Sequence, residues 1–542
     1  MNIEGGENVS TTMLKRVSKY QIKNSHELFE YCDNESFKAK NLRNLANYHI
    51  RQCFILSSKE ELNKDQVIYL KDINNAIDEF NDKKKALFYE KKPQKIEKAK
   101  LELDDFIKSK FNSKNYKDEL EKKKESLKKL IKSEYKPHKY INSENALISY
   151  DFLDFYFSNY LKSEDNPYKM LAIQTSQQIL RNLFKDWKSF FVSIKDYNKN
   201  KSKYKYKSKY KGRPKLPKYK DKNGRVKLSM TNQSCKIKNG KLTLPKTKLT
   251  LEVGIDVSNS KLKEVRIIPM GSVYKIELVL DKEFKNNVKL NEKAFIGIDL
   301  GLSNLATITN NIGLKPIIIN GKPLKSINQY YNKKKSLMQE NMPLYTFVRY
   351  DKKNNIYINE RRQRSYSKKM DSLTRKRNAK IDDYMHKASA FIVNYCIENL
   401  IGNIVIGKNE NWKNEISIGA KNNQNFVSIP FNKIINMITY KAESFSINVN
   451  IIEESYTSKS SFLDLDDIPT FKEGEKYKFS GKRISRGLYK TKNIIINADV
   501  NGSYNILRKF DNTLFKKEDI KSLLTIPKII NLSGYINKKK LA

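Results

Sequence analysis

The sequence predicts a multidomain α/β protein. From residue 291 onward, strand-like apolar runs alternate with helical segments, which is the pattern of an α/β layer. Short alternating runs with Gly-containing turns over 226–280 indicate an antiparallel β unit. Residues 36–56 and 171–194 carry apolar side chains at helical spacing. At about 100–200 residues per domain, a chain of 542 residues has room for several domains.

The segments before the β unit differ in character. Residues 13–22 alternate basic and apolar side chains, which predicts a short strand. Residues 60–136 are rich in Lys and Glu, and we expect a solvated antiparallel helix pair broken at Pro93. That pair either spaces domains or contacts nucleic acid, and the sequence leaves both open. The helix 171–194 has the clearest pattern, with Leu, Phe and Trp at three- and four-residue steps.

The charge balance indicates a polyanionic partner. The chain has 106 Lys and Arg against 60 Asp and Glu, a formal net charge of +46. Such a charge repels itself in a free compact protein, and nucleic acid is its usual partner. A low-GC genome explains why Lys outnumbers Arg. It does not explain why basic residues outnumber acidic residues by so many.

Cysteine and histidine usage excludes several classes of protein. The four cysteines are scattered singly without a CxxC pair, which excludes a disulfide scaffold and a zinc ribbon. Four dispersed histidines exclude a His-rich metal site. No apolar run approaches the roughly 18 residues of a membrane span, and the N-terminus lacks the apolar core of a signal peptide. We expect a cytoplasmic protein without membrane contact.

Two basic tracts are candidate nucleic-acid surfaces. In 199–225, Tyr204, Tyr206 and other tyrosines alternate with lysines, as in surfaces that track a nucleic-acid backbone and stack bases. The alternative is a solvated linker. Residues 372–387 predict a basic helix, whose charged face is either only solvated or binds a nucleic-acid duplex. The candidate binding residues are Lys203, Tyr204, Lys205, Tyr206, Lys207, Lys209, Lys211, Arg213, Lys215, Lys218, Arg375, Lys376, Arg377 and Lys380.

The segment AFIGIDLGLSNLATITN (294–310) carries most of the chemical information. It reads as a strand, a turn and a second strand, with Asp299 inside an apolar run. An ionised carboxylate there is costly unless it meets a cation or a metal. RNase H-like nucleases begin this way, and their carboxylates hold two Mg²⁺ ions roughly 4 Å apart. The actin-like ATPases also open on such a strand, but the chain shows no further Gly-rich phosphate loop.

Two later strands end in acids. INVNIIEE (447–454) ends in Glu453 and Glu454, of which alternation allows only one to face Asp299. NIIINADV (493–500) delivers Asp499 at the start of a helix. Asp299, one glutamate and Asp499 would form a two-metal carboxylate set. Asp464, Asp466 and Asp467 compete with them, but lie in an expected loop.

Ten segments in order resemble the TnpB nucleases encoded by insertion sequences, the OrfB family related to type V CRISPR effectors. The segments are FKAKNLRNLANYHIRQ (37–52), QTSQQILRNLFKDWKSFF (174–191), GRPKLPKYK (212–220), FIGIDLGLSNLAT (295–307), LTRKRNAKIDDYMHKAS (373–389), IVIGKNENWK (404–413), NQNFVSIPF (423–431), ESYTSKSSFLD (454–464), SGKRISRGLYK (480–490) and NADVNGSYNILRK (497–509).

The resemblance implies an RNA-guided DNA endonuclease with a RuvC-type, RNase H-like domain, a β-barrel wedge domain and an α-helical recognition lobe. Asp299 matches the first RuvC aspartate and Asp499 the third-motif aspartate. The implied division is 1–22 wedge strand, 23–195 recognition lobe with the insertion 60–136, 196–290 wedge barrel, 291–509 RuvC domain with a loop at 457–493, and 510–542 basic tail.

The chain departs from the family pattern at two places. Most members carry the catalytic glutamate directly after the IVI strand, where this chain has Gly407. One branch resembles this chain there, and its resemblance implies a glutamate from the ESYTSK strand. We expect Glu454, with Glu453 as the alternative. The CxxC pairs usual between TSK and the last aspartate are missing, so we expect no zinc and a basic lid over 480–490.

The expected function is RNA-guided cleavage of double-stranded DNA beside a short motif, with two Mg²⁺ ions, or Mn²⁺, as cofactors. Guide RNA from the transposon end and target DNA are the expected partners, in the nucleoid of a prokaryotic host. The alternative is an inactive relative that binds DNA under RNA guidance and represses transcription. A third interpretation, a strand-transferring transposase, would need either a catalytic Tyr with a paired His motif, which the chain lacks, or independent recognition of the transposon ends.

Overall fold

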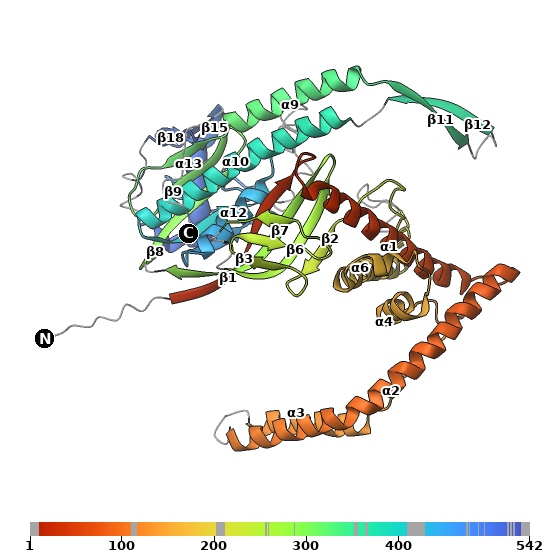
Figure 1. Ribbon diagram of the computed structural model, residues 1–542. Coiled ribbons are helices and arrows are strands. Elements are labelled where there is room, and N and C mark those ends of the chain that lie inside the picture. The colour runs from red at the N-terminus through yellow and green to blue at the C-terminus, as the bar shows by residue number, and fades with distance from the viewer. Residues whose placement is uncertain are drawn as a thin grey trace. The chain divides into compact units, whose positions relative to one another are not determined.

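The computed structural model describes residues 10–532 apart from short gaps (Figure 1). The gaps are 110–115, 202–211, 255–256, 258–259, 287, 352–355, 364–366, 409–428, 473–474, 476, 486, 493, 517–519, 521–522 and 524–525. The chain divides into two compact units. The N-terminal unit is 16–281, and the C-terminal unit is 282–542 with 1–15. Each is described by itself.

The N-terminal unit contains a helical part and a β part. Its helices are α1 (Leu28–Leu56), α2 (Lys64–Ser109), α3 (Tyr116–Lys132), α4 (Tyr150–Phe155), a π-helical turn (Tyr156–Tyr160), α5 (Pro167–Met170) and α6 (Ile173–Lys199). Trp187 of α6 is buried and donates to Asn47 Oδ1 of α1 over 3.0 Å. The apolar faces of α1 and α6 share one core with strand residues such as Leu228 and Met230.

The predicted break at Pro93 is wrong. α2 continues through Pro93 and has α3 folded back along it (Figure 1). The flanking residues are mostly strong helix formers, and Lys92 Nζ donates to Ser133 O over 2.7 Å, which ties α2 to the chain beyond α3. The helix pair itself is confirmed.

The β part consists of two sheets in the described residues. A four-stranded sheet has the order β1 (Ser10–Ile22), β7 (Val273–Asn286), β6 (Lys261–Met270) and β2 (Leu228–Thr231). A three-stranded sheet joins β3 (Lys236–Lys238), β4 (Lys241–Thr243) and β5 (Thr250–Glu252). The strand predicted at 13–22 is confirmed and begins earlier. The described strands of this part are hydrogen-bonded in two separate sheets, and the β-barrel wedge domain that the resemblance implied stays a prediction.

The C-terminal unit is built on a mixed six-stranded sheet. Its order is β14 (Asn448–Ile452), β13 (Ile401–Gly407), β8 (Asn291–Leu300), β9 (Asn304–Asn310), β10 (Ile317–Asn320) and β18 (Lys528–Ile530). β8 pairs parallel with β13, and β13 parallel with β14, whereas β9 is antiparallel to both β8 and β10. The central β13 is buried along its whole length, which explains its continuous apolar sequence.

Helices cover both faces of this sheet. They are α9 (Lys322–Glu340), α10 (Lys368–Glu398), α12 (Phe431–Glu443) and α13 (Ala498–Phe510), followed by a short 3₁₀ turn (Asn512–Leu514). Ile404 and Ile406 of β13 share a core with α10 and α12, whereas Val405 between them packs against Ile506 and Leu507 of α13. Because strand side chains alternate, one face belongs to α10 and α12 and the other to α13.

Two smaller β elements complete the unit. β11 (Leu344–Asp351) and β12 (Ile356–Gln363) form a hairpin between α9 and α10. β15 (Lys482–Ser485), β16 (Leu488–Lys490) and β17 (Ile495–Asn497) form an antiparallel sheet that runs directly into α13. Among the described helices, none combines the length and the apolar character that a membrane crossing requires.

The close approach of α13 to β8 predicts the effect of a single methyl group. A Cβ added at Gly297 would lie 2.6 Å from Ser503 O and 2.8 Å from Leu507 Cγ. Gly297→Ala should therefore destabilise the C-terminal unit by about 1–3 kcal/mol, the usual cost of overpacking, measured by urea unfolding. Lys528→Ala, an exposed change in the same sheet, should stay within about 0.5 kcal/mol. Equal stability of the two variants would contradict this packing.

Candidate nuclease site

Three carboxylates gather where the parallel strands of the C-terminal unit end. Asp299 is the penultimate residue of β8, and Gly407 is the last of β13. Glu454 follows β14 by two residues. Asp299 and Gly407 lie on the α13 face, because their even-numbered neighbours pack on the opposite side. α13 brings Asp499 in its first turn. This edge of a sheet is where α/β proteins commonly place their ligands.

Asp299 is half-buried and electrostatically coupled to the other two acids. Burial raises its pKa well above the usual range, and the charges of Glu454 and Asp499 raise it further. The guanidinium of Arg483 acts in the opposite direction. A Cβ at Gly502 would lie 3.0 Å from Asp299 Oδ2, so the glycine allows α13 to approach this carboxylate. Carboxylates that destabilise one another in this way form a site that attracts cations.

Asp499 is held on both of its oxygens. Asn304, the first residue of β9, donates to Asp499 Oδ2 over 2.7 Å. Arg483 of β15 donates to Oδ1 over 3.2 Å. The helix itself starts at the side chain of Asn497, which accepts from the backbone N–H groups of Asp499 and Val500 over 3.0 and 3.1 Å. Arg483 places a positive charge from the expected basic lid beside the carboxylates.

Sequence reasoning did not single out Asn304 or Arg483. Asn304 lies five residues after Asp299, in the same motif, and could have been found as an amide at the turn between two candidate site strands. Arg483 is one of several cations in SGKRISRGLYK, and the sequence does not distinguish it from the others.

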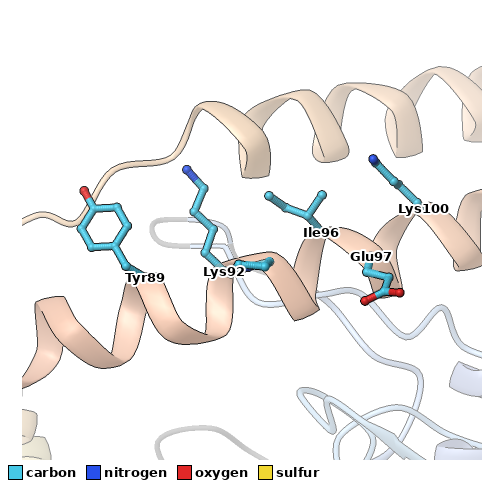
Figure 2. Close-up of a pocket in the computed structure, with 6 residues that line it drawn as sticks. Tyr89, Lys92, Ile96, Glu97 and Lys100 are labelled. Carbon is cyan, nitrogen blue, oxygen red and sulfur yellow. The ribbon is translucent and has the colours of Figure 1, made fainter.

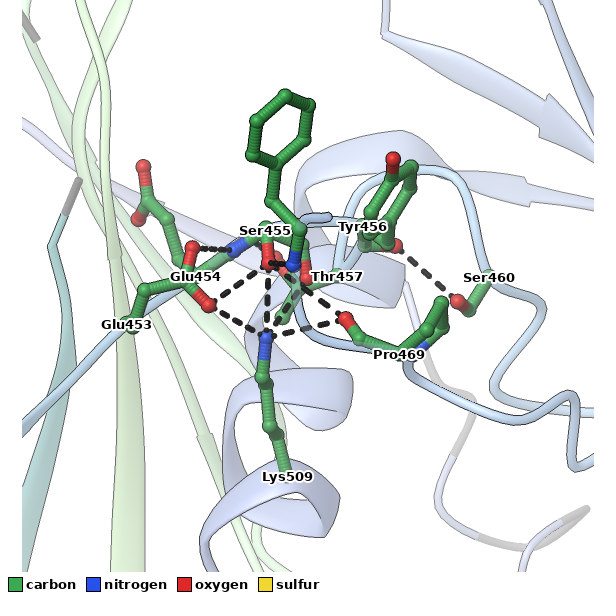
Figure 3. A network of polar contacts seen from close by, with 9 residues as sticks. Glu453, Glu454, Ser455, Tyr456, Thr457, Ser460, Pro469 and Lys509 are labelled. Carbon is green, nitrogen blue, oxygen red and sulfur yellow. Dashed lines mark hydrogen bonds and ion pairs between the residues drawn. The ribbon is translucent and has the colours of Figure 1, made fainter. Parts of the chain in front are cut away.

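The two adjacent glutamates face different surroundings. Glu453 accepts from Lys509 Nζ over 2.7 Å and from both the N–H and the hydroxyl of Ser455 over 2.7 Å. Glu454 points away from this network (Figure 3). Its Oε2 is buried and lies 2.8 Å from where a Cβ at Gly407 would stand. The carboxylate of Glu454 therefore occupies the space where a side chain at the end of β13 would begin.

The donor set fits Mg²⁺ in its chemistry. Asp299, Glu454 and Asp499 supply only carboxylate oxygens, which hard divalent cations prefer. Gly407 and Gly502 lack the Cβ atoms that would stand 2.8 Å from Glu454 Oε2 and 3.0 Å from Asp299 Oδ2. In the described ranges, no three Asp, Glu, His or Cys side chains are arranged to hold a metal as they stand. Asp499 faces Arg483 instead, so metal binding requires its carboxylate to turn from that cation.

Hydrogen bonds organise the segment in which the family usually has CxxC pairs. Residues 431–506 contain neither Cys nor His. Asp464 Oδ2 accepts from the hydroxyls of Ser461 and Ser480 over 2.6 and 3.0 Å. Asp466 Oδ2 accepts from the backbone N–H groups of the same two serines over 2.9 and 3.0 Å. Asp464 and Asp466, which the sequence offered as alternative metal ligands, therefore connect the residues around Ser461 to those around Ser480.

The candidate nucleic-acid-binding residues differ in where the structure places them and in whether they already have partners within the protein. Lys203, Tyr204, Lys205, Tyr206, Lys207, Lys209 and Lys211 lie outside the described residues. On α10, Arg375 pairs with Asp371, and Arg377 donates twice to Asn328 Oδ1 over 2.8 and 2.6 Å. Lys376 and Lys380 are exposed. The two lysines are therefore better placed than the arginines for an external phosphate.

Arg213, Lys215 and Lys218 are exposed on an ordered segment of the N-terminal unit. Side chains of α1 hold its backbone: Asn47 and Arg51 each donate to Pro217 O over 3.0 Å, Asn44 donates to Lys220 O over 2.9 Å, and Lys40 donates to Lys222 O over 2.6 Å. A fixed backbone lowers the backbone entropy that this segment loses when it binds a partner.

A hollow of about 440 Å³ lies along α2 (Figure 2). Its lining residues are Tyr89, Lys92, Pro93, Ile96, Glu97 and Lys100. One glutamate beside lysines and apolar side chains offers no catalytic set. The carboxylates at the sheet edge remain the candidate site.

The raised pKa of Asp299 predicts a stability change with pH. The folded chain keeps a proton that the unfolded chain releases above about pH 4, so this residue lowers stability as pH rises through that window. Asp299→Asn should therefore raise the melting temperature in EDTA at pH 7.5, by about 2–4 °C for each kcal/mol regained. The difference should shrink toward pH 4.

Asp511→Asn is the matched control for this pH series. Hydrogen bonds from Thr513 lower the pKa of Asp511, so its removal should not stabilise the protein at neutral pH. A melting temperature of Asp299→Asn at or below that of the parent at pH 7.5 would contradict the described electrostatics.

The chain matches models of known protein families in two of its segments. No curated protein matches it. The solved structure titled "Cryo-EM structure of the Cas12f1-sgRNA-target DNA complex" aligns with a TM-score of 0.37 at 12% identity, over 91% of this chain and 98% of that chain. "Cryo-EM structure of CRISPR-Cas12f Ternary Complex" aligns with a TM-score of 0.28 at 12% identity, with the same coverage of 91% and 98%. These TM-scores are too low to carry an argument.

The family models are more informative. Residues 431–506 match the model described as Cas12f1-like, TNB domain. Residues 277–413 match the model OrfB_IS605, described as probable transposase. The resemblance to the OrfB family is confirmed over residues 277–413, and residues 431–506 are similar to the Cas12f1-like TNB domain.

Proposed function

We propose that the chain is an Mg²⁺-dependent, RNA-guided DNA endonuclease of the TnpB type. The observation that carries the proposal is the convergence of Asp299, Glu454 and Asp499 at one edge of the sheet. β8, the turn and β9, with Asp299 on the first strand, match the opening of an RNase H-like nuclease. The OrfB_IS605 and TNB matches cover the segments that contain all three acids.

Each residue has a role that follows from its contacts. Asp299, Glu454 and Asp499 would hold the two metal ions, which when bound would supply an activated water and stabilise the leaving oxygen. Asn304 orients Asp499 by its 2.7 Å hydrogen bond. Arg483 lies beside these acids and carries a charge that can meet a phosphate once Asp499 turns to the metal. Residues 431–506 contain no Cys or His that could hold a zinc ion, so the proposed role of this segment does not depend on one.

Glu454, rather than Glu453, completes the proposed set. Two observations support this choice: the Glu454 carboxylate lies over Gly407, and Glu453 is occupied by Lys509 and Ser455. Lys376, Lys380, Arg213, Lys215 and Lys218 are the exposed candidates for holding guide and target through the phosphate backbone. Target binding should accordingly weaken steeply with salt.

Cleavage by purified protein tests the proposal. The protein is co-expressed with its flanking DNA so that guide RNA co-purifies, and target binding and Mg²⁺-dependent cutting are measured on the same sample. Asp299→Ala and Glu454→Ala should reduce cutting by more than the roughly 100-fold that loss of a residue behind a metal ligand can cost. Target affinity should stay within a few-fold.

Glu453→Ala is the matched control. It should retain more cutting than Glu454→Ala, since it removes a neighbour of the metal ligand and not the ligand. Binding without any cutting by the parent protein would instead make the chain an RNA-guided repressor. Cutting that survives Asp299→Ala would reject the assigned site.

A further inference from the structure

We propose that one face of α13, formed by Asn501, Asn505 and Lys509, positions Glu454 for metal binding. The inference rests on the proposed function and assigns residues that touch neither metal nor substrate. The three residues are spaced by four, so they lie along one side of the helix. Together they bind the chain that follows β14, Lys509 at its beginning and the two asparagines at the turn beyond Glu454.

Lys509 holds the beginning of that segment (Figure 3). Its Nζ donates to Glu453 Oε2 over 2.7 Å, to Ser455 O over 2.9 Å and to Ser455 Oγ over 3.1 Å. A fourth contact, at 3.4 Å, reaches Pro469 O. The lysine side chain is 12% exposed and the Glu453 side chain 40% exposed, so solvent screens part of this ion pair and the hydrogen bonds to Ser455 share in fixing the segment. Residues on both sides of Glu454 are thus fixed by one cation.

Asn505 and Asn501 hold the turn after Glu454. Both side chains are fully buried. Asn505 Nδ2 donates to Thr457 O over 2.9 Å and to Ser460 O over 2.7 Å. Asn501 Nδ2 donates to Ser460 O over 2.8 Å, and its Oδ1 accepts from Phe462 N over 2.9 Å. The turn 456–462 is therefore tied to α13 by buried amide hydrogen bonds, which are costly to leave unmade.

This arrangement answers a problem specific to Glu454. A metal ligand within a strand is oriented by the sheet, but Glu454 lies two residues beyond the end of β14. α13 also carries Asp499, so a single helix places one ligand directly and fixes the backbone that bears another. Outer residues of this kind commonly set metal affinity as strongly as ligand geometry does.

Lys509→Met tests the inference, since it keeps the aliphatic stem and removes the charge. It should raise the Mn²⁺ dissociation constant, measured by calorimetry on the guide-loaded protein, by about 10-fold or more. The single-turnover cutting rate at saturating target should fall by about 10–100-fold. Target affinity should stay within about twofold, and Lys509→Arg should recover part of the Mn²⁺ affinity.

The controls separate positioning from folding. Lys516→Met removes the same charge from an exposed site just beyond α13 and should leave Mn²⁺ binding unchanged. Glu453→Gln, which keeps the side-chain shape but breaks the ion pair, should weaken Mn²⁺ binding in the same direction if Lys509→Met proves too unstable to purify. Parental Mn²⁺ affinity in Lys509→Met or, where that variant cannot be purified, in Glu453→Gln would overturn the inference. Equal losses of target binding and cutting would do so as well.

A parent protein that cuts, with Lys509→Met cutting equally well, refutes only the positioning role. A parent that binds no Mn²⁺ and cuts nothing refutes the proposed function and the inference together.

Discussion

The packing of α13 directly on β8 is the constraint on which the rest of the site depends. Gly297 leaves no side chain between strand and helix, and Ser503 Oγ lies within hydrogen-bond distance of Gly297 O and Thr307 O, at 2.9 and 3.0 Å. This contact sets how close Asp499 comes to Asp299. Since α13 also binds the segment after β14, its position determines where Glu454 lies.

Electrostatic strain accompanies this geometry. Burial and then the charges of Glu454 and Asp499 raise the pKa of Asp299, and Arg483 relieves part of the repulsion by pairing with Asp499. A site of this kind is less stable empty than filled, because a divalent cation removes the repulsion that folding imposes. The same strain that lowers stability thereby favours metal binding.

Much of the sheet and its acids could be predicted from the sequence. The apolar runs around Asp299 and before Glu453 predicted two of the strands, and NADV predicted the strand-to-helix junction at Asp499. The roles of Asp464, Asp466 and Lys509 could not be predicted. Apart from the local contacts of the two aspartates with Ser461, their partners lie 14 to 56 residues away in the sequence, and no local periodicity indicates such pairs. The continuation of α2 through Pro93 was missed because propensity rules describe a proline without its helical surroundings.

The most direct measurement is the location of Mn²⁺ by anomalous X-ray diffraction from crystals of the guide-loaded protein. We expect anomalous peaks among the carboxylates of Asp299, Glu454 and Asp499, with Arg483 displaced from Asp499. Peaks at Asp464 and Asp466, or a metal bound by Glu453, would contradict it.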